Sequence, residues 1–161
     1  MGVYSAPLAE GSFFLFEEDF VEENVRCIPM IVRFKLDACG IKLKLAEWSK
    51  FKPEEKEQLA AQSCGTKEET ATYKKYLQEL ILGRTGNKAT ELATDEHPAW
   101  AEADRLTPEL DNKAKESGWE ISIEQWKSLT SLQRFALLKL CRPGHENKNF
   151  PKAMKEFNLI K

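Results

Sequence analysis

The sequence predicts a mainly α-helical fold: a compact single domain of about six to seven helices with two short extended segments, built on an internal duplication offset by 78 residues. Three observations lead to this prediction. The 161 residues are 42% hydrophobic and 31% charged, as in a soluble globular domain. Apolar residues recur at helical spacing, and two stretches of the chain match each other. We expect a flexible N-terminal leader over residues 1–12 and a single helical domain over residues 13–161.

The duplication appears when the chain is shifted along itself so that Lys35 is aligned with Lys113. The shift places KLDACGIKLKLAEWSKFKPEEKEQL, residues 35–59, over KAKESGWEISIEQWKSLTSLQRFAL, residues 113–137. Apolar positions coincide along both stretches, and four identities fall at Lys35, Gly40, Trp48 and Leu59. We interpret the stretches as two copies of one supersecondary unit, around residues 26–64 and 107–142.

Each copy has the pattern of a helix, a short extended segment, a tryptophan-bearing turn and a second helix. The first helix ends at Gly40 or Gly118, because glycine adopts the left-handed conformation of a helix C-terminus. Three apolar residues then alternate with polar ones, as in a strand with one buried face. Pro53 predicts the next helix start in the first copy. In the second copy, capping-box spacing predicts helix starts near residues 123 and 131. The capping boxes are Ser122 with Gln125 and Thr130 with Gln133.

The remaining segments contain two further helices. Thr66 with Glu69 forms a third capping box, which predicts a helix that ends near Gly83. Residues 85–106 are expected to be a loop with a possible helical turn at 88–93. The C-terminal stretch NFPKAMKEFNLI predicts a short helix. The apolar positions of these helices are Tyr73, Tyr76, Leu77, Leu80 and Ile81 in the first, and Phe150, Ala153, Met154 and Phe157 in the second.

Charge and cysteine content restrict the classes of function. The net charge of −2 provides no overall field for nucleic acid or an anionic membrane, and the apolar runs are far shorter than the ~20 residues that span a bilayer. The charge is uneven, at −5 over residues 1–30 and +4 from residue 139 onward. Four cysteines without close pairs are typical of reduced, buried thiols. We therefore expect a cytoplasmic protein.

The stretch CRPGHENKNF, residues 141–150, gathers the most varied chemistry. Pro143 and Gly144 separate Cys141 from His145 and break helical register, so a catalytic pair is not expected. Ligands are too scattered for a typical metal site, and GRTGNKAT at residues 83–90 resembles a helix end more than a phosphate loop. Two interpretations of 142–149 remain open: a recognition surface, or internal bracing.

Three stretches carry a resemblance to a known family: RCIPMIVRFKLDACGIKLKLAEW at 26–48, LILGRTG at 80–86 and LQRFALLKLCRPGHENKNF at 132–150. They resemble the cyanobacterial and algal nitrate reductase-associated proteins, over residues 13–159. The resemblance implies a non-catalytic accessory or maturation factor that binds assimilatory nitrate reductase and supports its activity or molybdenum-cofactor loading. It also implies the cytoplasm, or the plastid stroma in an alga. No catalytic residue, cofactor or metal is carried over.

The resemblance also suggests where a partner binds. Its diagnostic residues form a candidate partner-binding surface, with Arg142 and His145 as anchors. The full set is Arg26, Cys27, Pro29, Arg142, His145, Glu146, Asn147 and Asn149. An alternative is a small-ligand binding protein for an anionic pterin cofactor or precursor, held by Arg142, His145 and Arg84. A third is an enzyme that uses Cys27 or Cys141, and the oligomeric state stays open.

Overall fold

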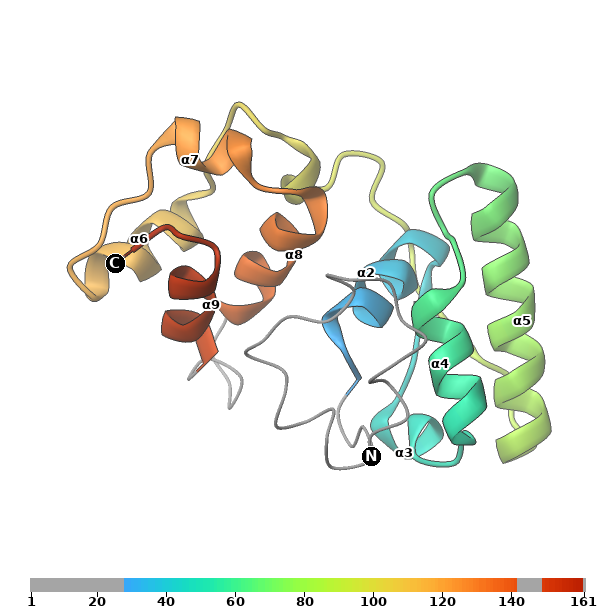
Figure 1. The fold of residues 1–161 in the computed structure, drawn as a ribbon. Helices are drawn as coiled ribbons and strands as arrows, with labels where there is room; N and C mark the ends of the chain where they lie inside the picture. Colours follow the sequence, from blue (N-terminus) through green and yellow to red (C-terminus); the bar gives the residue numbers. More distant parts are fainter. Residues whose placement is uncertain (1–27, 142–148, 161) are drawn as a thin grey trace. The chain divides into compact units, whose positions relative to one another are not determined.

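The computed structural model describes residues 28–141 and 149–160 and confirms the mainly α-helical fold. The described residues contain eight α-helices, one 3-10 helix and a two-stranded sheet (Figure 1). They divide between Asp95 and Glu96 into two compact units, here called unit 1 and unit 2. No helix in these two described ranges is long and apolar enough to cross a membrane. The single domain over residues 13–161 stays a prediction.

Unit 1 is built around the long helix α5. Its elements are α2 (Met30–Cys39), β1 (Ile41–Lys42), α3 (Leu45–Trp48), α4 (Pro53–Ala61), α5 (Lys67–Thr85) and β2 (Thr90–Glu91) (Figure 1). Helices α2 and α3 pack against α5, and β1 pairs antiparallel with β2 so that Ile41 faces Glu91. The core is apolar and buried from solvent. Its fully buried members include Val32, Trp48, Leu59, Tyr73, Leu77 and Ile81.

The described residues of unit 2 form five helical elements: η2 (Ala99–Ala101), α6 (Pro108–Glu116), α7 (Ile123–Ser128), α8 (Ser131–Leu140) and α9 (Phe150–Glu156). Side chains of α7 and α8 tether the η2 segment. Arg134 Nη1 donates to the carbonyl of Trp100 at 2.7 Å, and Trp126 Nε1 donates to the carbonyl of Glu102 at 2.8 Å. The apolar core beneath includes Leu110, Ala114, Trp126, Phe135, Leu137, Phe150 and Met154.

The helices of the two units start at matching places in the sequence. The first residues of α2 and α6, of α3 and α7, and of α4 and α8 are separated by the same offset that aligns the two stretches of sequence. Trp48 and Trp126 are both fully buried, and each lies beside a mostly buried cation. Lys56 Nζ is 5.4 Å from the Trp48 ring centroid, and the Arg134 guanidinium carbon is 5.9 Å from that of Trp126. The spacing is what a duplication predicts, but the internal duplication itself stays a prediction.

The capping boxes are confirmed at all three predicted helix starts. The side chains of Thr66, Ser122 and Thr130 each accept the backbone N–H three residues later. Helix α5 continues past the predicted end at Gly83, because nothing there breaks the helix. It ends before Gly86, whose φ of 76° is left-handed.

The extended segments differ from prediction. The first is a strand only over Ile41–Lys42, because Leu45 begins α3 instead of continuing the alternation. The Glu47 carboxylate accepts the Lys44 N–H at 2.8 Å, which favours a helical turn. The second segment forms no strand. The helical turn predicted at 88–93 is also wrong, since Thr90–Glu91 is the partner strand of β1.

Candidate functional site

Six of the eight predicted partner-binding residues lie outside the described ranges. They are Arg26, Cys27, Arg142, His145, Glu146 and Asn147. The two described residues, Pro29 and Asn149, are both buried. A direct contact of these two side chains with a partner is therefore not supported.

Pro29 and Asn149 occupy helix starts. The Pro29 carbonyl accepts the backbone N–H groups of Val32 and Arg33, both at 3.0 Å, and so starts α2. Asn149 precedes α9 and is 3% exposed, and its side chain makes no capping hydrogen bond. Both residues are thus buried at helix starts, and a role for them in partner binding stays a prediction.

Of the described thiols, Cys39 is buried, and Cys64 and Cys141 are partly exposed. Burial raises the pKa of Cys39 to about 11 and also raises the pKa of Cys64. Cys141 is half-buried, and its Sγ lies 3.2 Å from the Leu138 carbonyl oxygen. A raised pKa lowers the thiolate fraction, so neither Cys39 nor Cys64 resembles an activated nucleophile. Residues 28–141 and 149–160 hold no group of three or more metal-ligating side chains.

Arg84, considered as an anion ligand, is already paired. Its Nε and Nη2 donate to the two carboxylate oxygens of Glu55, at 3.1 and 2.6 Å. This pairing lowers the pKa of Glu55. The pair borders an open cavity of 360 Å³ lined also by Tyr76, Glu79, Leu80 and Gly83. Because Glu55 satisfies Arg84 and Glu79 adds negative charge, this cavity does not favour an anionic pterin.

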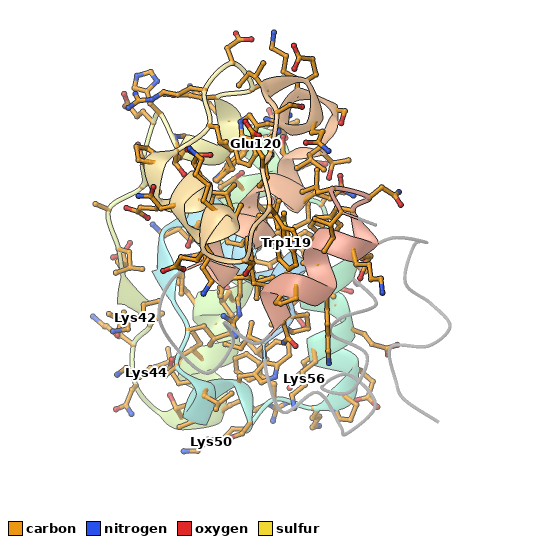
Figure 2. The ribbon with its side chains drawn as sticks, turned by 90° about the vertical axis from the view of Figure 1, so that its left-hand side faces the viewer. Lys42, Lys44, Lys50, Lys56, Trp119 and Glu120 are labelled. Carbon is orange, nitrogen blue, oxygen red and sulfur yellow. The ribbon has the colours of Figure 1, made fainter. Side chains whose placement is uncertain are left out.

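A lysine-rich surface in unit 1 is the feature that the sequence analysis missed. Its lysines are close in the sequence and all exposed, and we call them the lysine corner: Lys42, Lys44, Lys50 and Lys52. Figure 2 shows Lys42, Lys44 and Lys50 pointing outward. Leu45, on the first turn of α3, lies between Lys44 and Lys50 in the sequence and is 56% exposed. The corner thus combines positive charge with one exposed apolar side chain.

Two neighbouring carboxylates do not form salt bridges with these lysines. Glu47 is 8% exposed and accepts the Lys44 backbone N–H. Glu55 accepts the Lys52 backbone N–H at 2.7 Å and holds Arg84. Within the described part of the chain, no lysine of the corner forms a salt bridge. The spaced lysines of KLKLAEWSKFK are the sequence signal for this surface, and they were interpreted only as the polar side of a strand and a turn.

Comparison with known proteins confirms the resemblance seen in the motifs. The chain matches the family described as conserved nitrate reductase-associated protein over residues 13–157. No curated protein and no solved structure gives a significant match. The family match spans most of the chain and covers most of each unit. The chain therefore belongs to the conserved nitrate reductase-associated protein family.

Proposed function

We propose that this protein is a non-catalytic accessory factor that binds assimilatory nitrate reductase and supports its activity or its molybdenum-cofactor loading. Membership of the nitrate reductase-associated family, through a match over residues 13–157, carries the proposal. The family is described by its association with an enzyme, and the description names no reaction of its own. The raised pKa of Cys39 and Cys64 is consistent with a protein that does not use these thiols for catalysis.

Binding alone is sufficient for such a role. A protein that binds one conformation of the reductase more tightly than another shifts the population toward that conformation. If the favoured conformation accepts or retains the molybdenum cofactor, the accessory factor raises the active fraction without touching the cofactor. The chain then needs a docking surface and no catalytic group.

The loop at 142–149 remains part of this proposal. Arg142 and His145 are its anchors, since the planar guanidinium of arginine suits carboxylates on a partner. Glu146 and Asn147 accompany them, with Arg26 and Cys27 from the other diagnostic stretch. Pro29 and Asn149 have a different role, because both are buried at helix starts. We assign them to support of the adjoining segments.

Co-purification tests the proposal. The tagged chain is captured under native conditions from nitrate-grown cells, and nitrate reductase is measured in the eluate by immunoblot and activity. We expect reductase to be recovered with the wild-type chain and to be reduced with Arg142→Ala/His145→Ala. Failure of the wild-type chain to retain any reductase would contradict the proposal. Equal retention by wild type and double variant would remove only the loop from it.

Cofactor loading requires a separate experiment. Purified cofactor-free reductase is incubated with molybdenum cofactor, with and without the chain, and the rate at which activity appears is measured. We expect the chain to increase this rate or the final activity. Calorimetric titration of the chain alone with a molybdopterin compound is the control. Heat from direct binding there would favour the alternative of a pterin-binding protein.

A further inference from the structure

Two helix starts in unit 1 carry lysine at the N-cap position. Lys44 precedes α3 and Lys52 precedes α4, and neither side chain makes a capping hydrogen bond. Lysine is a poor N-cap, because its ammonium group donates hydrogen bonds and cannot accept one from the helix backbone. The matching positions of unit 2 precede α7 and α8 and carry Ser122 and Thr130, which both cap their helices.

The rest of each capping box is kept in unit 1. Glu47 and Glu55 accept the backbone N–H groups of Lys44 and Lys52, as Gln125 does for Ser122. The two units differ at the N-cap residue, which is a cation in unit 1 and a hydroxyl side chain in unit 2. A local rule of helix stability is therefore broken at two successive helix starts, and such departures are expected at functional sites.

The same comparison extends to the other two lysines of the corner. The positions of unit 2 that match Lys42 and Lys50 hold Glu120 and Ser128. Figure 2 labels Lys42 and Glu120, each within its own unit. All four cations of the corner are thus specific to unit 1, although the helices beneath them begin in the same register in both units. In unit 2, helices that begin at the matching places form without lysine at these positions.

Within residues 28–141 and 149–160, no carboxylate lies within salt-bridge distance of the four lysines of the corner. Between residues 42 and 53 the chain has four lysines and one acid, Glu47, a balance of +3 in a protein of net charge −2. Glu47 is nearly buried and is used by a backbone N–H. The nearest following acids are Glu54, which is exposed, and Glu55, which is held by Arg84.

We propose that the lysine corner is a docking site for an acidic segment of a partner protein, whose carboxylates face the four lysines and whose apolar side chain covers Leu45. The inference rests on the proposed function, because nitrate reductase is the partner expected to present this segment. Exposed leucine at the corner favours a protein over a nucleic acid, whose phosphate backbone offers no apolar group to cover it.

The test replaces the two cap lysines by the residues that unit 2 uses. The variant Lys44→Ser/Lys52→Thr loses two positive charges while gaining two good N-caps. The matched control, Lys67→Ser/Lys75→Ser, removes two exposed lysines from α5 and adds no charge elsewhere. The dissociation constant for purified nitrate reductase is measured at low and high salt, and the melting temperature of each variant is recorded.

We expect the cap variant to bind the reductase about three- to tenfold more weakly at low salt, with a smaller salt dependence and an unchanged or higher melting temperature. The control should bind as wild type does. Weaker binding together with higher stability would exclude unfolding as the cause. Equal binding by wild type and cap variant would overturn the docking role of the lysine corner and leave the proposed function standing.

Two further outcomes separate the possibilities. Absence of any binding between wild-type chain and reductase would overturn both the proposed function and this inference. To test nucleic acid as an alternative ligand, a single-stranded RNA is titrated in parallel under the same conditions. RNA binding that the cap variant loses and the control keeps would assign the corner to nucleic acid and overturn the protein-docking proposal.

Discussion

Gly40 is a residue at which conformation and packing both require glycine. Its φ of 73° is left-handed, where a side chain is strained. A Cβ there would lie 2.7 Å from the Leu92 carbonyl oxygen, a backbone atom. That backbone is itself fixed, because the Leu92 N–H donates to the Gly40 carbonyl at 2.7 Å. The clash therefore has no easy relief.

We expect Gly40→Ala to lower the free energy of unfolding by about 2–4 kcal/mol, since backbone strain and the steric clash add. Urea denaturation measures this change in the free energy of unfolding. The control is Gly86→Ala, which shares the left-handed φ, 76°, but has no atom within 4 Å of the added Cβ. That variant should lose only about 1 kcal/mol. Equal losses at the two positions would show that contact with Leu92 contributes nothing.

Cys39 should make the stability of the fold depend on pH in the alkaline range. Burial raises its pKa to about 11 in the folded protein, against 9.0 for an ordinary thiol. Between these values the unfolded chain releases the proton first, so the folded state binds more protons and stability falls as pH rises. We expect the melting temperature to decrease from about pH 9 to pH 11, and less steeply in Cys39→Ala, measured by circular dichroism. An identical slope in that variant would remove Cys39 as a cause.

At the scale of single elements, the short helices depend on their caps. Helices α3 and α7 have four and six residues, too few for helix propensity alone to stabilise them. Helix α7 has a serine cap and α3 a lysine, while both have a side chain that accepts the N-cap N–H. The cap residue is thus the main local difference at the two helix starts.

Exchanging these caps should change stability in opposite directions. We expect Lys44→Ser to raise the free energy of unfolding by about 0.5–1 kcal/mol, because Ser Oγ can accept the N–H of Glu47. The reverse change, Ser122→Lys, should lower it by about 1 kcal/mol through loss of the hydrogen bond from Gln125. Chemical denaturation of both variants measures the two shifts. A loss of stability in Lys44→Ser would contradict this account of the lysine N-caps.

Element starts could be predicted from sequence wherever the signal is local. The capping boxes at Thr66, Ser122 and Thr130 depend on residues three apart, and all three were correctly predicted. Strand β2 could not be predicted, because Thr90–Glu91 is a strand only through pairing with the distant β1. Helix α3 was missed because alternation of Ile41, Leu43 and Leu45 has the period of a strand.

The candidate site was harder to predict than the elements. The burial of Pro29 and Asn149 depends on packing from distant segments, which motif composition does not reveal. The lysine corner was visible as charge in the sequence. Whether nearby carboxylates pair with these lysines depends on the other hydrogen bonds that the carboxylates accept. Those bonds are known only from the contacts of Glu47 and Glu55 in the structure. Comparison of the two units adds that the matching positions of unit 2 hold no lysine.

At the scale of the whole molecule, the chain passes from unit 1 to unit 2 between Asp95 and Glu96. Residues 92–97 are exposed and form no helix or strand. Beyond them, the backbone at Trp100 and Glu102 is tethered by side chains of Arg134 and Trp126. Protease sites before and after the start of this tether should therefore differ in susceptibility.

A protease specific for glutamate tests this difference at Glu96 and Glu102. We expect cleavage after Glu96 to be faster, because Glu102 must release the Trp126 indole N–H before its backbone can enter a protease. Mass spectrometry of the fragments over time measures both rates. Trp126→Phe keeps an aromatic ring but removes the donor, so it should accelerate the cut after Glu102 selectively. If both cuts accelerate equally, the variant has loosened unit 2 as a whole, and the single hydrogen bond does not protect Glu102.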